Sequence, residues 1–283
     1  MEHLFRTYTK KINWELDKPL NIWFWGDVHY DSDACDRDRF AWFLERSGKC
    51  PDSYFFCLGD VHDFASAREQ VALLKADLHE TTLEHFDDIV TKKNIHFAEL
   101  IKPMRGKLLG MVGGNHTWKL QNGKYSDEDL AERMEAPYLG WLCVYAITFD
   151  FGSNMSRTIY IVACHGQGGG KLIGTSINKL DDLKRIFPFA DIFVSGHDHQ
   201  RGGWPTTVLQ PVLCNGKLKL KQQRQYLVKS GSFLKAYEND KNQYTTKSLY
   251  RPSDLGAVKV AVSFHRNNKN RTTEIITDIE STV

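Results

Sequence analysis

The 283-residue sequence has little of several features that would place it in a specialised class of protein. Its formal net charge is only +2, so attraction of the whole molecule to nucleic acid does not follow from its charge. No stretch approaches the roughly 18 apolar residues of a membrane span. The first residues also lack the apolar segment of a signal peptide. We therefore expect a cytoplasmic protein that does not bind a membrane.

The six cysteines form no CxxC pair and no zinc-finger spacing. This pattern gives no reason to expect a disulfide framework or a structural zinc site. The sequence also shows no internal repeat, no low-complexity linker and no clear domain boundary. We therefore expect one domain over residues 1–283, with a basic C-terminal part, rich in strands, from about residue 201.

The charge of that C-terminal part is unevenly distributed. The cations Arg201, Lys217, Lys219, Lys221, Arg224, Lys229 and Lys235 all precede its first acid, Glu238. Together with the interleaved Tyr226, Phe233 and Tyr237, they could contact a nucleic-acid strand through charge and stacking. The alternative is a solvated face in which the aromatic side chains fill the core, and we favour the core for Phe233.

Short apolar runs alternate with longer polar stretches in the first two thirds of the chain. The runs at 22–25, 54–58, 108–112, 159–164 and 192–194 predict buried strands. The stretches at 36–46, 69–101, 126–135 and 176–186 have helical character, and the second reads as one helix or as two with a break near 92–94. Near the C-terminus, residues 258–264 and a segment through Ile275 and Ile279 alternate as strands around a turn at 266–271. The pattern predicts an α/β protein of two packed sheets with helices outside.

Polar residues follow each of the five apolar runs. In chain order they are Asp27 and His29; Asp60, His62 and Asp63; Asn115 and His116; His165; and His197, Asp198 and His199. Ligands bind beyond the carboxyl ends of strands in such sheets, so we expect these clusters to converge. Carboxylates, an amide oxygen and imidazoles together suit borderline divalent metals such as Mn, Fe, Zn, Co or Ni. One shared carboxylate among many ligands predicts two metals about 3.5–4 Å apart with water between them.

Each of these motifs is more often structural when it occurs alone, but the ordered set resembles one family. That family is the calcineurin-like metallophosphoesterases, whose motifs in chain order are DxH, GDxxD, GNH(D/E), H and GHxH. The resemblance implies that one metal is held by Asp27, His29 and His199, and the other by Asn115, His165 and His197, with Asp60 bridging. It also implies that His116 is the catalytic residue and that Asp63 supports the site from behind the ligands. The implied fold is a two-sheet α-β-β-α sandwich.

One position departs from the family pattern. The acid that usually follows GNH, and often orients the histidine, is replaced by Thr117. Asp31, Asp198 and His62 are candidates to take over its role, although each also reads as an ordinary polar loop residue. A glycine-rich stretch at 165–171 resembles a phosphate-binding loop, but Leu172 follows Lys171 where that motif needs Ser or Thr. Lys171 remains a candidate substrate contact, and a simple glycine turn is the alternative.

The sequence therefore predicts a metal-dependent phosphoric ester hydrolase. We expect two divalent ions, Mn before Fe, Zn, Co or Ni, and direct attack on phosphorus by a hydroxide that bridges them. The resemblance is closest in kind to microbial or phage phosphodiesterases and nucleases. Single-stranded DNA or nucleotides are the favoured substrates. The alternatives are a small-molecule phosphomonoesterase and a non-catalytic metal-binding scaffold.

Overall fold

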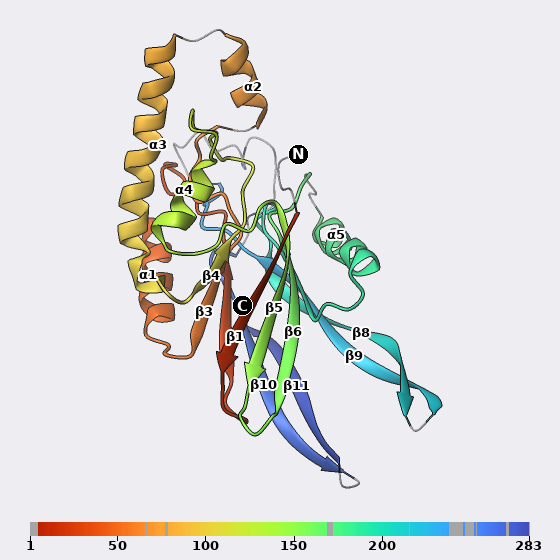
Figure 1. Ribbon diagram of the computed structural model, residues 1–283. Coiled ribbons are helices and arrows are strands. Elements are labelled where there is room, and N and C mark those ends of the chain that lie inside the picture. Colours follow the sequence, from red (N-terminus) through yellow and green to blue (C-terminus); the bar gives the residue numbers. More distant parts are fainter. Residues whose placement is uncertain are drawn as a thin grey trace.

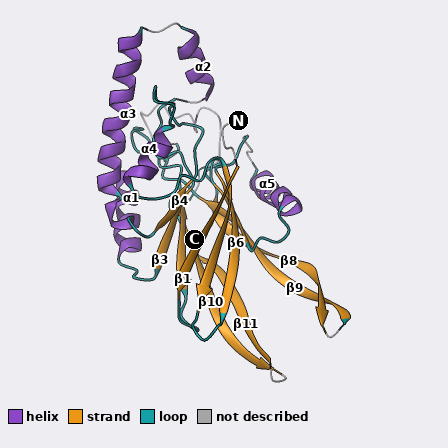
Figure 2. Cartoon of the chain, viewed as in Figure 1, coloured by secondary structure: helices purple, strands orange, loops and turns teal. Residues whose placement is uncertain are grey.

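The computed structural model is drawn in Figure 1 and describes most of the chain. The described residues are 5–65, 67–76, 79–168, 172–214, 216–237, 246, 252, 254–269 and 272–282. They form two β-sheets that pack face to face, with helices on the outer face of each (Figure 2). The expected α-β-β-α sandwich is confirmed. Among these residues, no helix combines the length and the apolar character needed to cross a bilayer.

The first sheet has five strands. Their order is β11 (Thr272–Thr282), β10 (Val258–Lys269), β2 (Leu20–Trp25), β3 (Ser53–Cys57) and β4 (Leu108–Met111). Strands β2, β3 and β4 are parallel, and β10 is antiparallel to β2. The carboxyl ends of the three parallel strands therefore meet at one edge of the sheet.

The second sheet has six strands. Their order is β1 (Phe5–Asn13), β5 (Leu142–Asp150), β6 (Ser156–Cys164), β7 (Ile192–Ser195), β9 (Lys217–Ser230) and β8 (Arg201–Cys214). Strands β6, β7 and β9 are parallel. The β8–β9 and β10–β11 hairpins extend beyond the body of the sandwich (Figure 1).

Helices cover both outer faces (Figure 1). On the five-stranded sheet lie α1 (Arg37–Gly48), α3 (Glu80–Leu100) and α4 (Ser126–Arg133), with α2 (Ala67–Lys75) and a short 3-10 helix (Lys102–Met104) beside them. On the six-stranded sheet lies α5 (Ile173–Ile186). Each helix group has its own apolar layer, centred on Phe40 and Phe97 in one case and on Leu180 and Phe193 in the other.

The main core lies between the sheets and explains why the apolar runs of the sequence are continuous. Phe24 of β2 packs in this inner core, whereas the next residue, Trp25, faces the helices and lies 5.9 Å from the ring of Phe40. Successive side chains of a strand point to opposite faces, so a strand buried on both faces needs apolar residues at every position. Each large apolar side chain buried in this way stabilises the fold by about 1.5–3 kcal/mol.

Two expectations about local structure were wrong. The break in the long helical stretch falls between Lys75 and Glu80, not near residues 92–94. Asn94 lies inside α3, where its buried amide donates to the Ser126 carbonyl and to Asp129, both at 2.8 Å, so it ties α3 to α4. The expected turn at 266–271 is mostly strand, because the ladder of β10 and β11 continues to the pair Lys269 and Thr272.

Candidate metal centre

The polar clusters predicted to converge do so at the carboxyl edge of both sheets. They follow β2, β3 and β4 in one sheet and β6 and β7 in the other, so the site lies across the top of the sandwich core. The loops turn sharply there. Asp27, His29, Asp60, His197 and His199 all have left-handed backbone, with φ of 47°, 46°, 49°, 73° and 59°. Such strain costs about 1–3 kcal/mol per residue and persists where surrounding contacts enforce it.

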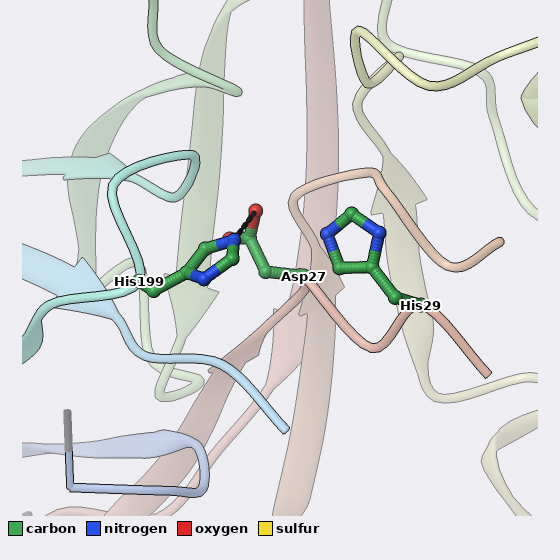
Figure 3. A group of neighbouring side chains, drawn as sticks. All are labelled: Asp27, His29 and His199. Atoms are coloured by element: carbon green, nitrogen blue, oxygen red, sulfur yellow. Dashed lines mark ion pairs between the residues drawn. The ribbon is translucent and has the colours of Figure 1, made fainter. Parts of the chain in front are cut away.

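A first group of ligand atoms is formed by Asp27, His29 and His199 (Figure 3). One ligand atom from each residue lies within 4.8 Å of the others. Asp27 is fully buried, and its Oδ1 is 3.7 Å from His199 Nε2. Its other oxygen accepts a hydrogen bond from the backbone N–H of His197 at 2.9 Å. The set combines one carboxylate and two imidazoles on loops that are fixed by backbone contacts.

A second group is formed by Asp60, His165 and His197, with Asn115 beside them. His165 Nε2 is 3.1 Å from Asp60 Oδ2, and Asn115 Oδ1 is 2.8 Å from His165 Nε2 and 2.7 Å from His197 Nδ1. The other ring nitrogen of His165 donates to the Leu58 carbonyl at 2.6 Å. That bond fixes the orientation of the ring and directs Nε2 toward the group, as second partners of metal-bound histidines do.

The donor set fits divalent cations. Asp27 Oδ1 and both ring nitrogens of His29 are buried without a hydrogen-bond partner among the described residues. Buried polar atoms are almost always satisfied, so three such atoms in one cluster indicate a partner other than the protein. The described residues thus include three groups of mixed nitrogen and oxygen donors that could hold a metal ion, the two above and a third of His29, Asp63 and His116 that shares His29 with the first. Such donors suit borderline metals.

Asp60 lies at the centre of the site because two glycine-containing loops approach closely. Gly59 has a φ of +88°, and a Cβ added at Gly114 would overlap the side chain and backbone nitrogen of Asp60. Asp60 Oδ1 accepts the backbone N–H of His116 at 2.9 Å, whereas its other oxygen faces His165. The bridging role assigned to Asp60 stays a prediction.

His116 contacts a carboxylate in spite of Thr117. Its Nδ1 is 2.7 Å from Asp63 Oδ1, and His29 Nδ1 is 3.8 Å from the same oxygen. Thr117 is buried and its hydroxyl bonds to that of Ser126 at 2.8 Å. The side chains of His116 and Asp63 are 27% and 42% exposed, so this pair lies at the mouth of the site.

The three residues suggested as substitutes for the missing acid make other contacts. Asp31 and His62 face each other at 3.6 Å, and Asp198 pairs with Lys229 at 2.7 Å. That suggestion was therefore wrong, because the fold brings the second acid of GDxxD to the histidine instead. Lys171 lies outside the described residues.

Burial and neighbouring charges shift the pKa values of the candidate ligands in opposite directions. Burial raises the pKa of Asp27 to about 6, with a further contribution from Asp60. Burial also lowers the pKa of His197 to about 4 and that of His199 to about 3, so both imidazoles stay neutral. For His165 burial acts against the charge of Asp60, and Asp60 dominates, which raises the pKa to about 10.

These pKa values predict that metal uptake depends on pH. Near neutral pH His165 carries a proton that a metal must displace, and below about pH 6 Asp27 carries one as well. The apparent affinity for Mn²⁺ should therefore rise with pH from about 5 to 9, with release of about one proton per protein at pH 7.5. Calorimetric titration in two buffers of different ionisation enthalpy measures that number. An affinity independent of pH with no proton release would contradict this charge arrangement.

The sequence analysis missed residues that support the loops of the site without supplying a donor atom. Asp127, buried in the first turn of α4, accepts the N–H of Gly114 at 2.8 Å, and Ser126 Oγ accepts that of Trp118 at 3.0 Å. Ser and Asp at the start of a helix can be recognised in a sequence as capping residues. The loop that they contact cannot be recognised there. Lys229 was also missed, because it was counted with the basic surface. It is 2% exposed and lies behind the site, bonded to Asp198.

The aromatic residues of the C-terminal part also divide between core and surface. Phe233 is fully buried, with its ring 5.0 Å from that of Phe40, so its expected core position is confirmed. Tyr226 is buried as well, and only Tyr237 is exposed, at 47%. Of the two alternatives for these aromatic side chains, core packing therefore holds for Phe233 and Tyr226, and only Tyr237 is placed to contact a nucleic-acid strand.

Comparisons with known proteins find only distant similarity to solved structures. No family model and no curated protein sequence matches the chain. Similar solved structures include vacuolar protein sorting 29 from Cryptosporidium parvum, at 14% identity and a TM-score of 0.35 over 94% of this chain and 100% of that one. They also include zinc-complexed Vps29 from Entamoeba histolytica, at 12% identity and a TM-score of 0.38 over 92% and 99%. A predicted phosphoesterase from Streptococcus pneumoniae has 14% identity and a TM-score of 0.35 over 94% and 99%.

Proposed function

We propose that this chain is a dinuclear metal-dependent phosphoesterase that cleaves phosphodiesters of nucleic acid or nucleotides. The observation that carries the proposal is the convergence of seven donor side chains from both sheets beside the partly exposed pair of His116 and Asp63. The seven are Asp27, His29, Asp60, Asn115, His165, His197 and His199.

The residues of the site support hydrolysis by water without a covalent intermediate. When bound, two divalent cations would neutralise phosphoryl oxygens and lower the pKa of water held between them. Asp60 stays ionised, because His165, His29 and His116 outweigh the effect of burial and hold the pKa of its carboxyl well below the ordinary range. Burial raises the pKa of the neighbouring Cys164 thiol to about 11, so it remains protonated and is a poor nucleophile. Water is therefore the expected attacking group.

His116 is placed to donate a proton. Burial lowers the pKa of its imidazole, but contact with Asp63 and the charges of Asp60 and Asp63 outweigh burial, so the net pKa is raised. His116 and His29 in turn hold the pKa of Asp63 well below its usual range. A protonated imidazole at the mouth of the site would protonate the leaving oxygen of a bound ester.

The β8–β9 hairpin supports an extended, anionic substrate. It begins at Arg201, two residues after His199, and the exposed Lys217, Lys219 and Lys221 of β9 lie toward its far end, opposite Cys214, Val212 and Gln210 of β8. Alternate residues of a strand share a face, so these three cations lie on one side of the hairpin. Three cations in a row suit a phosphate backbone better than a small phosphomonoester.

Hydrolysis of bis(p-nitrophenyl) phosphate and of p-nitrophenyl phosphate, compared with Mn²⁺ present, tests the proposal. We expect the diester to be cleaved faster, and single-stranded DNA to bind with an affinity that falls steeply with salt. A preference for the monoester would favour the small-molecule phosphomonoesterase. No turnover of either ester, with Mn²⁺ demonstrably bound, would favour the non-catalytic scaffold.

A further inference from the structure

A buried ion pair lies directly behind two histidines of the candidate metal centre. Lys229 Nζ is 2.7 Å from Asp198 Oδ2, and the two side chains are only 2% and 3% exposed. Ser176 Oγ donates to the same carboxylate oxygen at 2.5 Å. We refer to Asp198, Lys229 and Ser176 as the Asp198 anchor. Asp198 stands between His197 and His199 in the chain, yet its carboxylate contacts β9 and α5 rather than the donor atoms.

Stability alone gives a poor account of the anchor. Removing a lysine and an aspartate from water costs several kcal/mol per ion, and apolar replacements of similar volume are often as stable. A surface pair such as Lys11 and Asp150, at 2.6 Å, has no such cost. A buried pair beside a cluster of donor atoms therefore points to a positioning role.

The loop that carries Asp198 has a conformation that needs to be held. His197 and His199 have φ of 73° and 59°, so left-handed residues flank Asp198 on both sides. Besides the anchor, Asp198 Oδ1 accepts the N–H of Gln200 at 3.3 Å. Strained backbone persists only when the surroundings over-determine it, and the anchor supplies charged contacts at the centre of the strained segment.

The anchor also extends to the second loop of the centre through α5. Ser176 is 1% exposed, and one turn further along the helix Lys179 donates to the carbonyl of Gln167 at 2.8 Å. Gln167 lies two residues after His165. One face of α5 therefore contacts both the loop of His165 and the loop of His197 and His199.

We propose that the Asp198 anchor positions His197 and His199 for metal binding and keeps the Asp198 carboxylate from coordinating metal itself. The inference rests on the proposed metal centre but not on the identity of the substrate. Lys229 and Ser176 act through Asp198 and are positioning residues.

Four variants test the inference: Lys229→Met, Asp198→Asn with Lys229→Met, Ser176→Ala, and the control Lys11→Met. Lys229→Met leaves a buried carboxylate unpaired, and we expect a lower Tm and an affinity for Mn²⁺ reduced roughly 10- to 100-fold. The double variant removes both charges at similar volume. It should regain most of the Tm while metal affinity stays low and the visible spectrum of bound Co²⁺ stays altered. Lys11→Met should bind Mn²⁺ and Co²⁺ as the wild type does.

The outcomes separate the anchor from the proposed function. Wild-type affinity and an unchanged Co²⁺ spectrum in the double variant would show a purely structural ion pair and overturn the inference. Should both Lys229 variants fail to fold, Ser176→Ala decides: weakened Mn²⁺ binding supports the anchor and unchanged binding overturns it. A wild-type protein that binds neither metal would overturn the proposed function together with the inference.

Discussion

Replacing Asp60 by asparagine should reduce diester hydrolysis by more than about 1,000-fold, the largest effect expected of a single substitution. The amide keeps the shape of the side chain but removes the negative charge buried beside His165. Asp60 Oδ2 is 3.1 Å from His165 Nε2, and its Oδ1 accepts the N–H of His116 at 2.9 Å. One substitution thus changes a donor that the proposal assigns to both metals and the support of the proposed proton donor.

The measurement is turnover of bis(p-nitrophenyl) phosphate with saturating Mn²⁺, together with the metal content of the protein after dialysis. We expect Asp60→Asn to retain at most one metal. Asp150→Asn is a suitable control, because that carboxylate pairs with Lys11 at the other end of its strand. An Asp60→Asn protein that keeps two metals and a tenth of wild-type turnover would rule out a bridging role.

His116→Ala should lower kcat about 10²- to 10⁴-fold while affinity for Mn²⁺ stays near that of the wild type. His116 is 27% exposed and contacts Asp63, and the proposal assigns it to the leaving group although it also lies with His29 and Asp63 in a group that could hold a metal ion. The loss should be smaller for a p-nitrophenolate leaving group than for a dinucleotide, whose alkoxide needs a proton to depart. Equal losses of turnover and of Mn²⁺ affinity would show that His116 is mainly structural.

Asp63→Asn is the companion to that experiment. Asp63 raises the pKa of His116, so its loss lowers that pKa. An acid catalyst must be protonated, and the alkaline limb of the kcat profile should therefore move to lower pH. Asp181→Asn, which breaks a partly exposed pair with Lys184 on α5, should leave the profile unchanged. A profile that does not move in Asp63→Asn would exclude His116 as the titrating acid.

Much of the fold followed from one physical regularity in the sequence. Strands buried on both faces must be apolar at every position, so the runs that became β2, β3, β4, β6 and β7 were visible without any structure. Strands β1, β5, β8 and β9 were not identified individually, because partly exposed strands carry mixed side chains. The position of the helix break was also wrong. Asn94 has a low helix propensity, yet contacts with α4 hold it inside α3.

By itself, the sequence determined which donor side chains end which strands, because a strand's end and the residue after it are adjacent in the chain. Only the tertiary structure decided which of them meet. His116 lies 53 positions after its partner Asp63 in the sequence, and Lys229 lies 31 after Asp198. Nothing local distinguishes a lysine buried against a carboxylate from one in a basic surface. The difference arises when two sheets pack, since packing removes water from some charged groups and leaves others exposed.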